Sequence, residues 1–205
     1  MVQKLESFGV TDSRVLGVMR RMPRHIFVPE TFKAKAYQDA TLPIGFGQTM
    51  TQPLTTALML QALGLRGEER VLEIGTGTGY QTALLAALAR AVFSVERVAG
   101  LARDSQALLR DLGIINVSIK NFDGTYGWSE FAPYDAILVS ATAPVIPPPL
   151  IDQLAHGGRI VIPLAQNGKE EIWLGTRNGA GTVDMTPIAP CSFVRLVGRF
   201  GYPNL

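Results

Sequence analysis

From Val71 onward, the chain alternates short apolar runs with longer helical segments. The apolar runs predict strands at Val71–Ile74, Ala91–Val95, Val117–Lys120, Ala136–Ser140 and Arg159–Pro163. The segments between them predict helices at Gln81–Ala89, Val98–Leu112 and Pro148–His156. Strands that alternate with helices form βαβ units around a parallel sheet. The predicted fold class is therefore α/β, with a doubly wound and mostly parallel sheet.

The end of the chain follows a different pattern, in which two strand-like segments flank a turn. Glu171–Thr176 and Thr182–Pro187 lie on either side of Arg177–Gly181, which contains Asn178-Gly179. Asn-Gly between such segments is a strong hairpin signal. We expect the sheet to end in an antiparallel pair of strands.

The N-terminal part of the chain has a helical and mixed pattern. A helix is predicted to begin after Thr11-Asp12-Ser13 and to end before Pro23. A second helix is predicted after Thr51-Gln52-Pro53, because proline suits the first turn of a helix. Gly64 supplies the stop signal of this second helix.

The segment Asp39–Thr51 is rich in Gly, Thr, Pro and Gln and poor in large apolar residues. A polar loop of this kind ahead of a core is either a simple connector or a lid that faces the substrate. We expect two units, an N-terminal helical extension over residues 1–60 and the α/β core over residues 61–205, on which the extension packs.

Composition and charge exclude several classes of protein. The chain has 205 residues, of which 47% are hydrophobic and 18% charged, and a net charge of +2, so an ordinary packed core is expected and a nucleic-acid partner is not. Cys191 is the single cysteine, and with only His25 and His156 beside it no metal cluster is expected. The first thirty residues lack a secretory signal and the apolar runs are too short to span a bilayer. We expect a monomeric, cytoplasmic protein without a membrane partner.

The first candidate for chemistry is the loop that follows the strand Val71–Ile74. It reads Gly75-Thr76-Gly77-Thr78-Gly79 and leads into a helix, where three glycines let the backbone approach a ligand closely. A dinucleotide loop would need glycine at the position of Tyr80, and a diphosphate would sit badly beside Glu73. A cationic ligand tolerates this carboxylate, and S-adenosyl-L-methionine carries an ammonium and a sulfonium group.

Two further carboxylates follow the next two strands. Glu96 is placed to accept hydrogen bonds from ribose hydroxyls, and Asp123, before Gly124, to accept one from an adenine amino group. Because the carboxyl ends of parallel strands meet at one edge, we expect Glu73, Glu96 and Asp123 to face one crevice that holds S-adenosyl-L-methionine.

Several segments together resemble the protein-L-isoaspartate O-methyltransferase family over nearly the whole chain. They are Pro23–Pro29, Ala36–Asp39, Leu42–Pro53, Val71–Tyr80, Asp123-Gly124 and Gly157–Arg159. The stretch Leu-Pro-Ile-Gly-x-Gly-Gln-Thr from Leu42 is highly specific to this family, whereas many methyltransferases share the glycine-rich loop.

The resemblance implies a Rossmann-like methyltransferase fold and methyl transfer from S-adenosyl-L-methionine to the free carboxylate of L-isoaspartyl residues, a protein-repair reaction on damaged proteins and peptides. The cofactor-binding residues that it implies are Gln48, Thr49, Met50, Thr51, Glu73, Gly75, Thr76, Gly77, Gly79, Glu96, Arg97, Asp123 and Gly124. Those implied for the substrate are Pro43, Ile44, Gly45, Thr51 and Arg195.

Three positions depart from the pattern of the family: Thr51 replaces the usual serine before Gln-Pro, Phe122 a glycine and Arg195 a proline. Thr51 keeps the hydroxyl and is expected to position the substrate carboxylate or to cap the following helix, or to do both. Arg195 is expected to bind a carboxylate or to mark a divergent substrate. Two alternatives therefore stay open: a carboxyl methyltransferase for Asp or another carboxylate of a dedicated peptide, and a cofactor-binding protein without catalysis.

Overall fold

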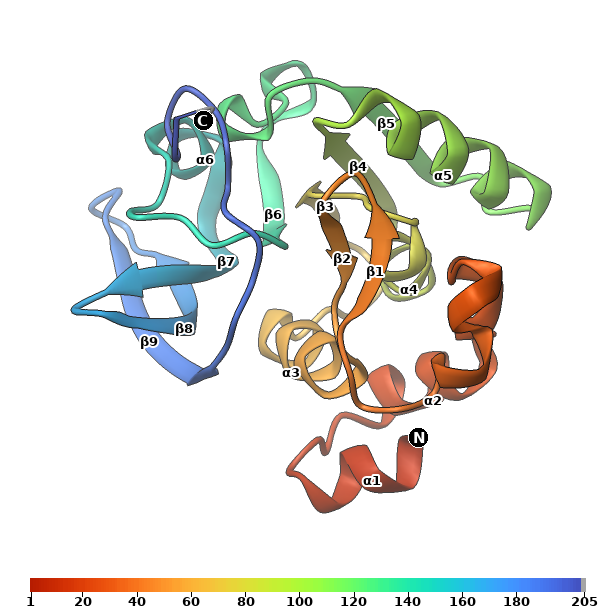
Figure 1. The fold of residues 1–205 in the computed structure, drawn as a ribbon. Helices are drawn as coiled ribbons and strands as arrows, with labels where there is room; N and C mark the ends of the chain where they lie inside the picture. The colour runs from red at the N-terminus through yellow and green to blue at the C-terminus, as the bar shows by residue number, and fades with distance from the viewer. Residues whose placement is uncertain (204–205) are drawn as a thin grey trace.

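The computed structural model describes residues 1–203, and its centre is a seven-stranded sheet with the strand order β5-β4-β3-β6-β7-β8-β9 (Figure 1). The strands from β5 to β7 run parallel, and β8 and β9 add an antiparallel edge. Their bounds are Arg70–Ile74 for β3, Ala91–Glu96 for β4, Val117–Asn121 for β5, Tyr134–Val139 for β6, Leu154–Gln166 for β7, Lys169–Arg177 for β8 and Val183–Pro190 for β9. The predicted α/β class, the mostly parallel sheet and its antiparallel end are confirmed.

Strand β7 is much longer than predicted, and it shortens the helix before it. Helix α6 spans Pro148–Gln153 and does not reach His156. Leu154 already pairs with Tyr134 of β6, and both side chains are fully buried. The prediction of a helix to His156 was wrong because pairing with the sheet overrides the helical pattern at this end.

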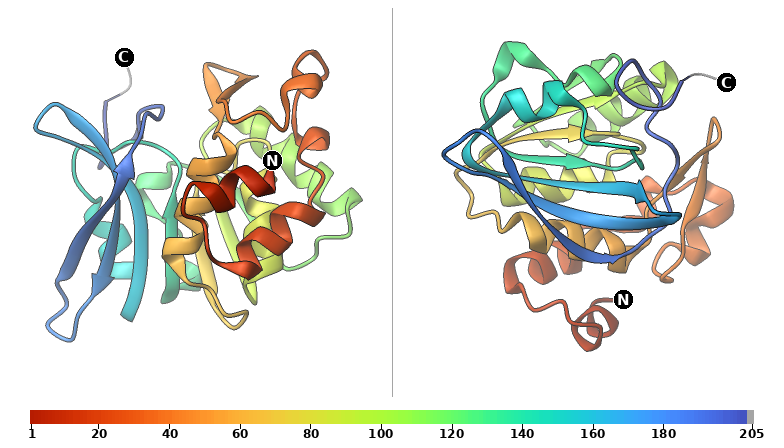
Figure 2. Two further views of the ribbon diagram at one scale, coloured as in Figure 1. Left: turned by 90° about the horizontal axis from the view of Figure 1, so that it is seen from below. Right: turned by 90° about the vertical axis from the view of Figure 1, so that its left-hand side faces the viewer.

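Helices and turns lie on both faces of the sheet (Figure 2), and the buried apolar side chains form two clusters. One cluster contains the buried faces of α3 (Pro53–Leu63), α4 (Tyr80–Leu88) and α5 (Ala99–Asp111). The other contains Leu150 of α6 and the rings of Trp128 and Phe131 at the 3-10 turn η4 (Ser129–Phe131), which follows the 3-10 turn η3 (Gly124–Tyr126). Because both faces are covered, the central strands are apolar on both sides.

The N-terminal segment adds helices to the layer of α3 and α4. Helix α2 spans Ser13–Arg21, and the Asp12 carboxylate caps it by accepting hydrogen bonds from the amides of Arg14 and Val15 at 2.8 and 3.2 Å. The sequence pattern did not predict the short helix α1 (Val2–Ser7) or the 3-10 turns η1 (Arg24–Phe27) and η2 (Glu30–Lys35). Helix α3 ends at Gly64 in a left-handed conformation, as predicted, and it continues across the expected boundary at residue 60.

The polar segment expected as a loop forms a hairpin of β1 (Leu42–Gly45) and β2 (Gln48–Met50). In Figure 1 this orange hairpin crosses the carboxyl end of the central strands. At its tip, Phe46 packs so closely on Gly100 of α5 that a Cβ there would lie 2.9 Å from the ring. The hairpin is therefore held against the core. Within residues 1–203, no helix has the length and apolar character needed to cross a membrane.

Candidate active site

The glycine loop, residues 75–79, connects β3 to α4, and its three glycines do not all serve the same purpose. Gly75 has φ +97°, and an added Cβ would lie 3.3 Å from Cβ of Ser140, so a side chain there is disfavoured by conformation and by space. Gly77 also has positive φ, at +55°. Gly79 precedes α4, and an added Cβ would lie 3.3 Å from Ser105 of α5. Gly75 and Gly77 therefore open the loop to a ligand, while Gly79 lets α4 pack against α5.

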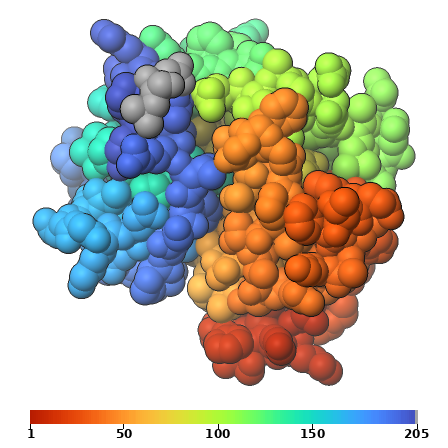
Figure 3. All heavy atoms as spheres, in the orientation of Figure 1, coloured from red at the N-terminus to blue at the C-terminus, as the bar shows by residue number. Residues whose placement is uncertain are grey.

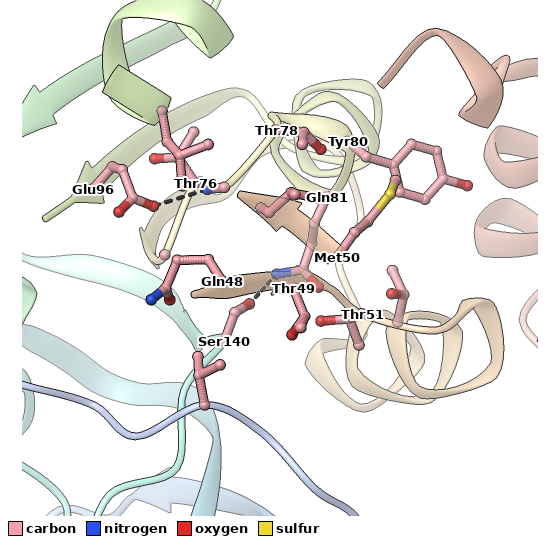
Figure 4. A pocket seen from close by; sticks show the side chains of 16 residues that line it. Gln48, Thr49, Met50, Thr51, Thr76, Thr78, Tyr80, Gln81, Glu96 and Ser140 are labelled. Atoms are coloured by element: carbon pink, nitrogen blue, oxygen red, sulfur yellow. Dashed lines mark hydrogen bonds between the residues drawn. The ribbon is translucent and has the colours of Figure 1, made fainter. Parts of the chain in front are cut away.

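A cleft of about 520 Å³, including the part open to solvent, separates this loop from the hairpin (Figure 4). In Figure 3 the orange surface of the hairpin and the blue surface of the C-terminal segment flank the same region. The cleft is lined by Ile44, Gln48, Thr49, Met50, Thr51, Thr56, Gly75, Thr76, Gly77, Thr78, Tyr80, Gln81, Leu101, Glu96, Ser140 and Val194. The structure thus brings the segment 48–51, the glycine loop and Glu96 together.

Gln81 and Ser140 are cleft residues that sequence reasoning missed. The Gln81 amide nitrogen donates hydrogen bonds to Ser140 Oγ at 2.6 Å and to Glu73 Oε1 at 3.3 Å. Its Oε1 atom is buried and has no hydrogen-bond partner among the described residues. A signal existed for Ser140, because it is the polar residue that follows the apolar strand next to β3.

Glu73 does not face the cleft, and the prediction that it does was wrong. Its side chain is fully buried behind the loop. Its carboxylate accepts hydrogen bonds from Thr82 Oγ1 at 2.6 Å and Ser94 Oγ at 2.7 Å as well as from Gln81. Burial raises the pKa of Glu73 to about 7, although these donors act in the opposite direction. Glu73 therefore ties β3 to α4 and β4, and it reaches the cleft only through Gln81.

Glu96 is the one of the three predicted carboxylates that lines the cleft. Its two oxygens accept hydrogen bonds from the amides of Gly77 at 2.9 Å and Val98 at 2.8 Å. A carboxylate has about four lone-pair sites, so capacity remains for hydroxyl donors. Glu96 also lines a second hollow of about 470 Å³, which includes Arg97 and Gly124 and is contiguous with the cleft through shared residues.

Asp123 lines neither hollow. Its Oδ1 accepts hydrogen bonds from the amide and the hydroxyl of Thr125 at 2.9 and 2.7 Å, and its Oδ2 accepts one from the amide of Arg199 at 2.8 Å. Asp123 is therefore the cap of η3 and the anchor of the C-terminal segment. Its neighbour Gly124 lines the second hollow instead, and a Cβ there would lie 2.4 Å from Ile74.

Thr51 lies at the other end of the cleft, with Thr49 and Ser140 nearby (Figure 4). It does not cap α3, whose N-cap is Gln52 without a side-chain hydrogen bond. The carbonyl of Thr51 accepts a hydrogen bond from Arg24 Nη2 at 2.8 Å. The Thr51 hydroxyl is therefore not engaged in capping.

The remaining predicted substrate residues are divided between the two sides of the site. Ile44 lines the cleft, whereas Pro43 and Gly45 are exposed on the outer side of the hairpin. Arg195 is exposed, lines the second hollow, and places its guanidinium carbon 5.1 Å from the ring centre of Tyr202. Arg195 therefore lines the same hollow as Glu96, whereas Thr51 lines the cleft.

Two other residues singled out in the sequence have ordinary surroundings. Phe122 is 44% exposed and packs on Tyr126 with ring centres 5.6 Å apart. His25 forms a hydrogen bond between Nδ1 and the Tyr37 hydroxyl at 2.7 Å, which is a partner that the sequence did not reveal.

Comparison with known proteins gives one consistent result. A family model described as protein-L-isoaspartate(D-aspartate) O-methyltransferase matches residues 1–201. Relatives named protein-L-isoaspartate O-methyltransferase include one from Syntrophus aciditrophicus, 49% identical over 97% of this chain and 92% of that protein, and one from Anaeromyxobacter dehalogenans, 50% identical over 96% and 95%.

Solved structures agree with this fold. One named protein-L-isoaspartate O-methyltransferase superposes with a TM-score of 0.87 at 28% identity, covering 98% of this chain and 67% of that one. Another, from Plasmodium falciparum and in complex with S-adenosyl-L-homocysteine, superposes with a TM-score of 0.81 at 24% identity, covering 94% of each chain.

Proposed function

The chain belongs to the protein-L-isoaspartate(D-aspartate) O-methyltransferase family, and from this premise we propose how its cleft performs the family's reaction. The protein transfers a methyl group from S-adenosyl-L-methionine to the free carboxylate of L-isoaspartyl residues in damaged proteins and peptides. The observation that carries this function is the near-complete match to relatives of that name, together with the family-specific segment 42–53 that forms one wall of the cleft.

The methyl donor fits the part of the cleft next to the glycine loop. Gly75 has no side chain, so the backbone of the loop stays open to a ligand where an added Cβ would lie 3.3 Å from Ser140. Glu96 keeps acceptor capacity for the ribose hydroxyls, and Gly124 lines the hollow beyond it. When bound, S-adenosyl-L-methionine supplies an activated methyl group on a sulfonium centre.

The methyl acceptor is a carboxylate, and this explains why the reaction needs few catalytic side chains. A carboxyl group with a reference pKa of about 4 is already ionised at neutral pH, so no general base is required. The work of the protein is to hold the acceptor oxygen in line with the methyl group and to exclude water, which contributes on the order of 7–11 kcal/mol at best. We assign the positioning of this carboxylate to the Thr51 hydroxyl.

The substrate is tested with three peptides of one sequence that contain isoaspartate, aspartate or neither at a single position. Transfer from labelled S-adenosyl-L-methionine is expected with the isoaspartyl peptide alone. Label in the aspartyl peptide would indicate a different carboxyl methyltransferase. Binding of S-adenosyl-L-homocysteine without any transfer would indicate a protein that has lost catalysis.

The role of Thr51 is tested by two substitutions. Thr51→Ser keeps the hydroxyl and is expected to retain activity, while Thr51→Val keeps the shape and is expected to lose most of it. Urea unfolding of both variants serves as the control, because their free energies of unfolding should match that of the parent to within about 1 kcal/mol. Unchanged turnover in Thr51→Val would remove this hydroxyl from the mechanism.

We also propose that the enzyme acts as a monomer in the cytoplasm. Loop, hairpin and C-terminal segment of one chain enclose the cleft, so a second copy is not needed to complete it. Light scattering at micromolar concentration tests the first statement, and cell fractionation tests the second.

A further inference from the structure

Arg24 is a completely buried arginine directly behind the acceptor end of the cleft. Its Nε donates a hydrogen bond to the carbonyl of Ala36 at 2.8 Å, and its Nη2 donates one to the carbonyl of Thr51 at 2.8 Å. The guanidinium carbon lies 4.7 Å from the ring centre of Tyr80, which also lines the cleft. Arg24 therefore holds the segment before β1, the residue after β2 and the first residue of α4 together.

The charge of Arg24 has little compensation within residues 1–203. No described carboxylate lies within 4.0 Å of the guanidinium, and Nη1 is buried without a partner. Asp39 acts on it from farther away, but this side chain is exposed and accepts a hydrogen bond from the amide of Leu54 at 2.9 Å. Burial lowers the pKa of Arg24, yet an arginine side chain stays protonated at neutral pH. Retaining an unpaired buried charge is costly, so a compensating role is expected.

On the basis of the proposed function, we propose that Arg24 determines the specificity of the acceptor site. Its buried charge makes the Thr51 end of the cleft positive, and this end therefore selects an ionised carboxylate over a neutral group. Arg24 acts through Thr51 and Tyr80 and does not touch the reacting atoms, so it is a positioning residue. Exposed Arg195 is screened by solvent and lies beside the second hollow.

This electrostatic role has a distinctive consequence for the ligands. The reaction converts an anionic carboxylate and a cationic sulfonium into a neutral ester and a neutral thioether. A fixed positive charge favours the bound carboxylate and disfavours the sulfonium relative to the thioether. It keeps part of the first effect in the transition state, where the carboxylate charge is only partly neutralised. Arg24 should therefore act on KM for the peptide and on the ratio of the Kd values of S-adenosylmethionine and S-adenosylhomocysteine, with kcat much less affected.

The test replaces Arg24 by glutamine. A unit charge about 7 Å from its partner changes affinity by about threefold in bulk water and about fiftyfold when partly shielded from it. We expect Arg24→Gln to raise KM for the isoaspartyl peptide by a factor in this range. Calorimetry should show a lower ratio of Kd for S-adenosylmethionine to Kd for S-adenosylhomocysteine. The matched control is Arg70→Gln, since Arg70 also lies over an aromatic ring, Phe93, but at the opposite end of β3.

Arg24→Lys distinguishes the effect of the positive charge from that of the hydrogen-bonding geometry of the guanidinium group. It also replaces Arg24→Gln as the test variant if Arg24→Gln does not fold. It keeps the charge and loses the planar fork, so the ratio of the two Kd values should stay at the parental value. A changed ratio in Arg24→Lys would overturn the proposal, as would an unchanged ratio and unchanged KM in a folded Arg24→Gln. The unaltered enzyme on the three peptides tests the proposed function separately, so the two ideas fail independently.

Discussion

Replacing the buried Glu73 by glutamine should stabilise the protein at alkaline pH. Glu73 accepts hydrogen bonds from Thr82, Ser94 and Gln81, but it is fully buried, and burial raises its pKa from 4.5 to about 7. Glutamine has nearly the same shape and no charge. The hydroxyl groups of Thr82 and Ser94 can reorient to accept from the new amide.

The sign follows from proton binding in the two states. Between pH 4.5 and pH 7 the unfolded chain has released the proton that folded Glu73 still holds, so stability falls as the pH rises through this window. Below this window both states are protonated, and above it both are ionised. A pKa shift of one unit corresponds to about 1.4 kcal/mol. The raised pKa of Glu73 therefore lowers the free energy of unfolding by on the order of 3 kcal/mol once the pH lies above this window.

The assay is urea unfolding of the parent and of Glu73→Gln at several values between pH 5 and pH 8. The free energy of unfolding of the variant minus that of the parent should increase by about 2–3 kcal/mol from pH 5 to pH 8. Groups common to both proteins cancel in this difference. A difference that does not change with pH would refute the reasoning.

Three other predictions concern the loop and the turn before β3. Gly75→Ala places a side chain against Ser140 at a residue with φ +97°, so it should weaken the binding of S-adenosylhomocysteine by at least about tenfold in calorimetry. The control is Gly179→Ala, which adds a methyl group in open space and should not change this binding. Glu69→Gln should cost about 1–2 kcal/mol in urea unfolding at pH 7, because the backbone amides of Arg66 and Gly67 donate hydrogen bonds to this carboxylate at 2.9 Å. Burial alone would raise the pKa of Glu69, but these amides lower it, so this contribution should be present above pH 4.5 and lost as the pH falls below that value. Equal unfolding energies of parent and Glu69→Gln at pH 7 would contradict this assignment.

Local signals predicted much of the fold because they act over a few residues. The apolar runs gave the positions of β3 to β6, and the helix signals at Asp12 and Gly64 matched an observed cap and an observed left-handed stop. The hairpin β1–β2 was not predicted, because its strands are short and its polar residues resemble a loop. Its conformation depends on contacts with distant residues such as Gly100.

The sequence predicted the location of the candidate site more accurately than the contacts of its side chains. Strand ends and glycines located the cleft, but strand position alone does not say which way a carboxylate turns. Glu73 turns into the core toward Thr82, and Asp123 turns toward Arg199. Arg24 lies far from the cleft in the sequence, and only the tertiary fold brings it to the carbonyl of Thr51.

The most direct test of the central claim is to locate the transferred methyl group within one peptide. A synthetic peptide would contain one isoaspartyl, one aspartyl and one glutamyl residue and a free C-terminus, so that four kinds of carboxylate compete in one cleft. After incubation with enzyme and S-adenosylmethionine, fragmentation in a mass spectrometer would assign the methyl ester to a residue. We predict that the ester is found only on the isoaspartyl carboxylate. An ester on the aspartyl, glutamyl or terminal carboxylate would contradict the account.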